Sequence, residues 1–517
     1  MHGALMVCGT SSDAGKSTVV TGLCRLLARH GVKVAPFKGQ NMSLNAMVTP
    51  AGGEIGRAQW LQAVAARAEP EVAMNPVLLK PTSERASQVV LMGRPLAVQD
   101  AATYRDAKHA LVDAVDAALA DLRARFDVVV CEGAGSPAEI NLFADDIVNL
   151  GLARRAAIPA VLVGDIERGG VFAHLYGTVA LLPADLAALV HGFVINRFRG
   201  DPALLGTGPA QLEERCGVPT LGVLPHLGHL ALDAEDSLAL ERPSGLPPLV
   251  AAGLDVAVLR LPRLANFTDI DPLVAEPGVS VRWVARHDAL GDPDLVIIPG
   301  TRSTIDDLSW LRATGLAAAL DALRSVSSPP PVIVGICGGF QMMGEDIDDP
   351  DAVESSHPSS SGLGWLPVRT TFAADKVTRL TAASLPVSVP GAEAVTLDGY
   401  EIRHGRLRPD DLYAPWFDAG DAATRHVDDV ISAVNRSGAV RGTTLHGVFE
   451  NNAFRSSFLA DVAARRGRAW EPSGLDYAAA REEQIERVAD ACEEHLDLER
   501  VWRIVERGAL NPRGGRA

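Results

Sequence analysis

The sequence predicts an α/β protein with two parallel-sheet domains in one chain. The 517 residues are enough for two to four domains. Short apolar runs alternate with longer amphipathic stretches, which is typical of strand–helix–strand units. A glycine-rich turn between an apolar run and a helical stretch occurs in each half of the chain, at residues 9–17 and 335–339.

Residues 1–240 are expected to form the first domain. Residues 4–8 are a compact apolar run, and residues 17–30 place apolar side chains near a helical period. Further buried strands are predicted at residues 32–37, 128–131, 160–163, 193–195 and 221–224, and a helix at residues 107–125. Strands that alternate with helices imply right-handed crossovers, so this domain should hold a largely parallel sheet covered on both faces.

A second series of alternating segments predicts another α/β domain over residues 250–460. Residues 241–248 are rich in Pro, Gly and Ser and are interpreted as the interdomain linker. Strands are expected at residues 255–261, 281–285, 295–298 and 332–336. The acidic, serine-rich residues 346–361 suggest an exposed loop, and residues 461–517 suggest a C-terminal helical appendage.

Composition excludes several classes of protein. The formal net charge of −16 argues against non-specific binding to nucleic acids or anionic membranes. The six cysteines form no CxxC pair, which argues against structural zinc and a disulfide framework. No apolar run is long enough to span a membrane, and the N-terminus does not match a signal peptide. We therefore expect a cytoplasmic enzyme, and the sequence does not specify its oligomeric state.

The first glycine-rich turn, GTSSDAGKS, predicts an ATP-binding loop. Glycines let successive backbone N–H groups face phosphate oxygens, and the following helix adds a partial positive charge. Lys16 would reach the β- and γ-phosphates and Ser17 would bind Mg²⁺. Five residues separate the glycines where the usual motif has four, and the alternative is an ordinary Gly/Ser-rich turn. The expected nucleotide-binding residues of the loop are Thr10, Ser11, Asp13, Ala14, Gly15, Lys16, Ser17 and Thr18.

Polar residues follow several other predicted strands of the first domain. Glu132 comes just after the strand at 128–131 and is the candidate partner of Mg²⁺, the alternative being a solvated loop glutamate. Asp165 occupies a similar strand end. Lys38 could supply another phosphate contact, and Asn196 could read an adenine edge. A simple loop role is the alternative for each of these last three residues.

The second glycine-rich turn predicts a nucleophilic cysteine. Cys337 follows an apolar strand directly and precedes a helix, and flanking glycines relieve the strain of such a tight turn. The helix N-terminus favours the thiolate form. Backbone N–H groups near Gly300 and Gly338 could form the oxyanion hole, and His446 is the candidate general base. The alternatives are a buried structural cysteine and an unrelated histidine.

The two halves together resemble a known enzyme family. The second half resembles class I glutamine amidotransferase domains, and the first resembles dethiobiotin synthetase-like ATPases, which share the longer phosphate loop. Their fusion in this order is similar to the corrin amidotransferase family, over nearly the whole chain. The most specific segments are residues 38–45 (KGQNMSLN), 56–59 (GRAQ), 75–81 (NPVLLKP), 165–172 (DIERGGVF), 196–201 (NRFRGD), 266–269 (NFTD) and 399–405 (GYEIRHG).

The resemblance implies a ligase that consumes ATP, Mg²⁺ and glutamine. The implied reaction is amidation of the b, d, e and g carboxylates of adenosylcobyrinic a,c-diamide to give adenosylcobyric acid. The alternative within the family is amidation of the a and c carboxylates of cobyrinic or hydrogenobyrinic acid; residues 38–45 favour the first reading. Outside the family, a scaffolding pseudoenzyme conflicts with the intact Lys16 and Cys337, and a partition-type ATPase leaves the second domain unexplained.

The same resemblance raises a question about the base. Class I domains typically carry a glutamate two residues after the histidine, whereas here Val448 occupies that position. Glu450 is four residues on, which is too far along a strand to hold the imidazole. The sequence therefore predicts a cysteine–histidine dyad without a third member.

Overall fold

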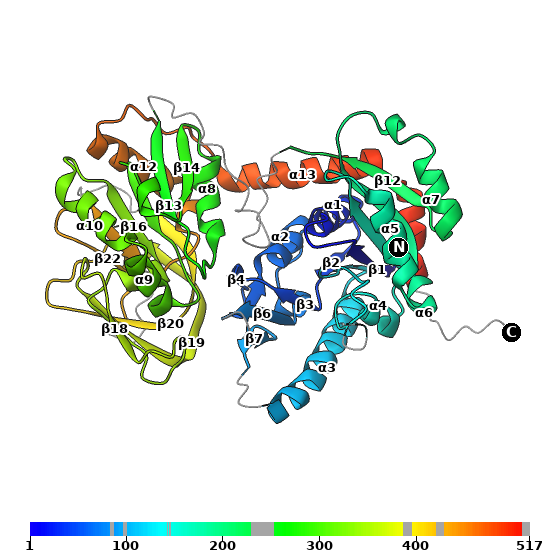
Figure 1. Ribbon diagram of the computed structural model, residues 1–517, viewed down its shortest axis with the longest axis horizontal. Coiled ribbons are helices and arrows are strands. Elements are labelled where there is room, and N and C mark those ends of the chain that lie inside the picture. The colour runs from blue at the N-terminus through cyan, green and yellow to red at the C-terminus, as the bar shows by residue number, and fades with distance from the viewer. Residues whose placement is uncertain are drawn as a thin grey trace.

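Two α/β bodies lie side by side in the computed structural model, joined along one edge by a long helix (Figure 1). The structure describes residues 1–82, 87–96, 101–141, 143, 146–228, 253–385, 395–419 and 429–508. The linker predicted at 241–248 lies outside the described residues. Among the described residues, no helix is long and apolar enough to cross a membrane.

The first body is built on a six-stranded parallel sheet in the order β12-β11-β10-β1-β9-β2. Its strands are continuous apolar runs because both faces of the sheet are covered. They confirm the six strands expected in this half of the chain. Their bounds are Gly3–Gly9 (β1), Val34–Phe37 (β2), Val128–Glu132 (β9), Ala160–Asp165 (β10), Val190–Phe198 (β11) and Thr220–Pro225 (β12).

Helices cover both faces of this sheet. Buried residues of α3 (Ala101–Arg125) join one core cluster with Phe37 and Met6, and those of α1 (Lys16–Arg29) join the other with Leu5. The other α-helices within residues 1–228 are α2 (Arg57–Ala65), α4 (Leu150–Ala156), α5 (Val171–Leu181), α6 (Ala184–Ala187) and α7 (Gly208–Cys216).

The C-terminal helices belong to the first body rather than standing apart from it. Helix α13 (Tyr477–His495) packs against α1, and α14 (Leu498–Arg507) packs against β1. Ile485, Val488 and Val505 are buried in the same core cluster as Val7 and Leu23. The helical pattern expected after residue 460 is present, and the buried side chains of α13 and α14 complete a core cluster that residues 5–224 of the first body build.

The second body holds a six-stranded sheet in the order β14-β13-β15-β16-β23-β22. Only the edge pair β22–β23 is antiparallel. The strands are β13 (Leu254–Leu259), β14 (Val279–Val284), β15 (Leu295–Ile298), β16 (Val332–Ile336), β22 (Ser432–Val434) and β23 (Val440–Thr443). The helices are α8 (Asp271–Ala275), α9 (Thr304–Ala313), α10 (Leu316–Val326), α11 (Gly338–Met342) and α12 (Asn452–Arg466).

An additional sheet corrects the expectation of an exposed loop at residues 346–361. This segment contributes β17 (Asp346–Asp348) and β18 (Ser359–Ser361) to a sheet with the long strands β19 (Val368–Ser384) and β20 (Thr396–Pro409). Between them, the buried carboxylate of Asp349 accepts the backbone N–H groups of Val353, Glu354 and Ser355. Residues 350–352 and 356–358 between the two strands are exposed, as expected for a loop. Composition alone could not show that the ends of the segment pair into a sheet, or that one buried acidic side chain organises the turn.

Short strands of the first body form its boundary with the second. Helix α2 and the pair β4 (Ala46–Val48) and β5 (Glu54–Gly56) lie on the side that faces β19 and β20 (Figure 1). A small sheet beside them contains β3 (Gln40–Met42), β6 (Val77–Pro81), β7 (Ser87–Leu91) and β8 (Arg94–Pro95). Tyr400 and Ile402 of β20 are buried in the core cluster of the first body, so the two bodies share apolar packing.

Candidate active sites

The predicted phosphate loop lies between β1 and α1, at the carboxyl edge of the first sheet. Gly15 caps the helix in a left-handed conformation (φ 95°), and Asp13 is also left-handed (φ 57°). The ammonium group of Lys16 folds across the loop and donates to the carbonyls of Ser11 (3.0 Å) and Gly135 (3.2 Å). A lysine held by backbone carbonyls beside a helix N-terminus can exchange them for phosphate oxygens.

The other loop residues predicted to bind the nucleotide differ in burial and in hydrogen bonding. The N–H of Thr10 bonds to the carbonyl of Val163, so it extends the sheet. Ala14 is fully buried, and Thr18 lies in the first turn of α1. Asp13 is exposed and forms an ion pair with Arg197 at 2.8 Å.

Glu132 is the centre of a buried polar cluster beside this loop. Its carboxylate accepts the hydroxyl of Ser17 (2.9 Å) and the ammonium group of Lys38 (2.9 Å), and Gln62 donates to its other oxygen. Glu132 has no exposed surface, and Lys38 is 2% exposed. The parallel neighbours β1, β9 and β2 end at the same edge, which is why residues from three separate segments meet here.

The donor atoms at Glu132 fit a hard divalent cation. The Ser17 hydroxyl and the Glu132 carboxylate are oxygen ligands that lie together, as Mg²⁺ prefers. Within the described part of the chain, no group of three His, Cys, Asp or Glu residues could hold a metal ion. Any Mg²⁺ here would therefore take its other ligands from phosphates and water, which is its common mode in nucleotide sites.

Asn196 and Asp165, near the ends of β11 and β10, contact the phosphate loop or its neighbours from the other side of β1. The Asn196 amide nitrogen donates to the carbonyl of Ala14 at 3.0 Å, so in this structure it supports the phosphate loop. Asp165 accepts Arg197 at 2.7 Å, and Arg197 also reaches Asp13. That Asn196 reads an adenine edge stays a prediction.

The predicted elbow is present in the second body. Cys337 directly follows β16 and precedes α11, with φ 50° and ψ −108°. Gly339 packs so tightly that a Cβ atom there would lie 1.9 Å from the carbonyl oxygen of Ile298. A glycine at position 339 therefore lets the turn after Cys337 pack directly against the end of β15. A Cβ atom on Gly300 would lie 3.8 Å from the Cβ of Cys337, so the loop after β15 borders the thiol.

His446 lies beside Cys337 because β16 and β23 are adjacent and parallel. Its ring stacks on Tyr400, with centroids 5.2 Å apart. Burial alone would lower the pKa of His446. The negative charge of Asp269 and the contact with Cys337 outweigh burial and raise that pKa well above its usual value. The histidine is therefore suited to carry a proton beside Cys337.

Asp269 overturns the expectation of a dyad without a third member. Its Oδ2 lies 2.7 Å from Nδ1 of His446, and its Oδ1 accepts the N–H of Gly447 at 2.7 Å. Both His446 and Asp269 are buried. A carboxylate in this place fixes the ring orientation and its tautomer. The sequence pattern missed it because the residue follows β13, 177 positions away from the histidine.

Glu450 has a different partner from the histidine. Its carboxylate accepts Arg57 of the first body (2.7 Å) and Arg481 of α13 (2.7 Å). These two arginines outweigh the effect of burial and hold the pKa of Glu450 below its usual range. The expectation that Glu450 does not hold the imidazole agrees with this geometry.

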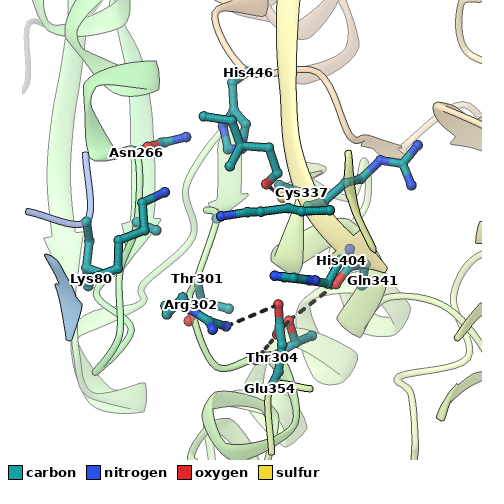
Figure 2. A pocket seen from close by; sticks show the side chains of 16 residues that line it. Lys80, Asn266, Thr301, Arg302, Thr304, Cys337, Gln341, Glu354, His404 and His446 are labelled. Carbon is teal, nitrogen blue, oxygen red and sulfur yellow. Dashed lines mark hydrogen bonds and ion pairs between the residues drawn. The ribbon is translucent and has the colours of Figure 1, made fainter. Parts of the chain in front are cut away.

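A pocket surrounds Cys337 and takes part of its lining from the first body (Figure 2). Leu44 and Lys80 come from the first body, and Asn266, Cys337 and His446 come from the second. The remaining lining residues are Ala265, Gly300, Thr301, Arg302, Thr304, Gln341, Glu354, Lys376, Ile402, Arg403 and His404. The cysteine site is therefore completed at the boundary between the two bodies.

The floor of this pocket carries opposite charges. Arg302 and Glu354 approach to 3.4 Å (Figure 2). The Thr304 hydroxyl lies 3.2 Å from a carboxylate oxygen of Glu354 and 3.3 Å from the side-chain oxygen of Gln341, and it can donate its one proton to either. Burial raises the pKa of Glu354, and Arg302 partly opposes this shift. Sequence reasoning missed both residues because they lie in loops without a motif.

Comparison with known proteins agrees with this architecture. Residues 5–238 match the family model described as the CobQ/CobB/MinD/ParA nucleotide binding domain. Residues 255–454 match the model described as the CobB/CobQ-like glutamine amidotransferase domain. These assignments confirm the predicted fold class.

Curated relatives match along nearly the whole chain. The chain is 51% identical to a cobyric acid synthase of Frankia casuarinae, with 98% of each chain covered. It is 50% identical to a cobyric acid synthase of Nocardia farcinica, again with 98% of each covered. For a cobyric acid synthase of Streptomyces avermitilis, identity is 49% over 98% of this chain and 97% of the relative. The chain belongs to the cobyric acid synthase family of glutamine amidotransferases.

Proposed function

We propose that this enzyme amidates the b, d, e and g carboxylates of adenosylcobyrinic a,c-diamide, with ATP as the activating substrate and glutamine as the nitrogen donor. The observation that carries the proposal is the placement of Cys337 and His446 in a pocket that the nucleotide-binding body helps to line, with Asp269 hydrogen-bonded to the histidine. The shared name of the curated relatives supports the choice of substrate.

In the glutaminase step, the Cys337 thiolate attacks the side-chain carbonyl carbon of glutamine. Backbone N–H groups near Gly300 and Gly338 stabilise the resulting oxyanion. His446 gives its proton to the leaving nitrogen. The C–N bond then breaks, NH₃ departs, and a thioester between Cys337 and the glutamyl group remains. Water, deprotonated by His446, then hydrolyses the thioester to glutamate. Asp269 keeps the imidazole oriented and stabilises its charged form throughout.

In the synthetase step, a corrin carboxylate oxygen attacks the γ-phosphorus of ATP. The product is an acyl phosphate, and ADP leaves. Ammonia then attacks the acyl carbon, the C–O bond to phosphate breaks, and the amide forms after loss of a proton. Lys16 and the loop N–H groups would stabilise the charge on the phosphoryl group during transfer.

Mg²⁺ would bind Ser17 with Glu132 next to it, and when bound it would neutralise charge on the phosphates. Lys38 now occupies one oxygen of Glu132. The lysine would therefore move from the carboxylate toward a phosphate when the nucleotide enters.

Mass spectrometry of the corrinoid tests the proposed substrate. Adenosylcobyrinic a,c-diamide incubated with enzyme, ATP, Mg²⁺ and glutamine should gain four amides in successive steps. Cobyrinic acid and hydrogenobyrinic acid should gain none at the a and c positions. Two amides added to either of those acids, with the diamide left unchanged, would assign the related a,c-diamide reaction instead.

A further inference from the structure

The turn that carries Asp269 is held by the nucleotide-binding body. The side-chain oxygen of Asn45 accepts the N–H of Phe267 at 3.0 Å. In return, the side-chain oxygen of Asn266 accepts the N–H of Ala46 at 3.0 Å. Two asparagines thus exchange hydrogen bonds across the boundary between the bodies. All of these residues are buried, so water cannot easily replace either bond.

The conformation of this turn explains why it needs support. Asn266 adopts a left-handed conformation (φ 50°), which asparagine tolerates better than most residues with a Cβ atom but which is still less favourable than the right-handed one. Its carbonyl accepts the N–H of Asp269 at 3.0 Å, so this residue directly sets the position of the carboxylate. A small rotation at Asn266 would move Asp269 away from Nδ1 of His446.

We propose that Asn45 is a positioning residue of the glutaminase, which acts from the other domain. It fixes the turn at residues 266–269 so that Asp269 meets His446. The inference rests on the proposed roles of Cys337 and His446. It implies that glutamine hydrolysis reaches full turnover only while the two bodies are docked as they are here.

The interface offers a matched control. Arg57 and Glu450 form an ion pair across the same boundary at 2.7 Å. The backbone N–H of Arg57 donates to the carbonyl of Asn45, but the exchange between the bodies is made by the side chains of Asn45 and Asn266. Glu450→Gln weakens that pair and leaves the asparagine exchange intact. A general loosening of the interface would affect this variant and Asn45→Ala alike, whereas the positioning role affects Asn45→Ala alone.

The test compares glutaminase kinetics of the full-length enzyme with Asn45→Ala, Asn45→Asp, Asn266→Gly and Glu450→Gln. Asn45→Asp keeps an acceptor for Phe267, and Asn266→Gly keeps the left-handed backbone but deletes the amide.

We expect Asn45→Ala to lower kcat on the order of 10-fold with KM for glutamine within about twofold, and Asn45→Asp to recover part of the loss. Asn266→Gly should lower kcat as well. Ammonia-dependent amidation should remain in every variant, which also reports that the protein is folded.

A second readout follows the Cys–His pair itself. The rate at which iodoacetamide alkylates Cys337, measured by peptide mass spectrometry across pH, should shift in Asn45→Ala as it does in Asp269→Asn. An unchanged profile and kcat in Asn45→Ala would overturn the positioning role, and so would an equal loss in Glu450→Gln or in ammonia-dependent amidation. Retained glutaminase in Cys337→Ala would instead overturn the proposed function.

Discussion

Asp269 Oδ2 lies 2.7 Å from Nδ1 of His446, although 177 positions separate the two residues in the chain. The contact gives the glutaminase site a carboxylate at the place where class I domains usually carry a glutamate two residues after the histidine. Here the carboxylate comes from the loop after β13. The same chemical arrangement is therefore reached through a different connection of the chain.

Asp269→Asn should lower glutaminase kcat on the order of 100-fold. Asparagine keeps the size of the side chain but removes the charge that raises the pKa of His446, so the imidazolium form is disfavoured. Steady-state glutamate release, with ammonia-dependent amidation as the control, measures the effect. Glu450→Gln should stay within about twofold of the wild type, because its carboxylate pairs with arginines and not with the histidine. Equal losses in the two variants would contradict the assignment of Asp269.

Cys337→Ala should abolish glutamine as nitrogen donor. The substitution deletes the thiolate that forms the thioester, while the synthetase site in the other body keeps its own groups. Amide formation is to be followed with glutamine and then with ammonium chloride at a pH that supplies free NH₃. Activity with glutamine would show that Cys337 is not the nucleophile. Loss of activity with ammonia in a folded variant would show that the two sites are not separable.

Lys16→Ala should lower amidation about 1000-fold or more with either nitrogen donor. Lys16 is the point charge expected on the transferring phosphoryl group, and Lys38, which now contacts Glu132, is expected to add a phosphate contact beside Lys16 rather than to replace it. Glutamine cleavage at Cys337 should continue, because no atom of Lys16 borders that pocket. Corrin amidation at the normal rate in this variant would contradict the role of the loop.

Stability should fall between pH 7 and pH 5 through His404. Burial, followed by the positive charge of Lys376, lowers the pKa of His404 to about 4. The unfolded chain binds a proton near pH 6.5 and the folded protein does not, so acidification favours unfolding until the pH reaches the folded-state pKa. The expected loss is about 2 kcal/mol over this interval. Thermal unfolding of the wild type and His404→Gln at both pH values measures it, and an equal loss in the two proteins would contradict the assignment.

The first body of the fold was predictable because its signals are local. Its strands are short apolar runs that must be buried wherever they lie, and they appeared at the expected positions. The phosphate loop and the Cys337 elbow were predictable for a related reason. Each turn needs glycine at a fixed distance from a functional side chain. One short segment therefore specifies both the backbone turn and the side chain that it presents.

Adjacency of strands could be anticipated, but partners on distant loops could not. Parallel strands end at one edge of a sheet, which is enough to bring Glu132 near Ser17 and His446 near Cys337. No comparable rule of strand adjacency predicts where Asp269, Asn45 and Glu354 lie. Their positions depend on how two bodies pack against each other and on how one buried carboxylate, Asp349, folds its loop.

The sequence by itself determined the two α/β domains, the glycine-rich loop after β1 and the position of Cys337 on an elbow between a strand and a helix, because periodic burial and glycine turns are properties of short segments. Only the tertiary structure decided which carboxylate orients His446, which residues of the first body line the cysteine pocket, and where the C-terminal helices pack. Those relationships join residues far apart in the chain, and their free energy comes from burial and hydrogen bonds that exist only once the two bodies are docked.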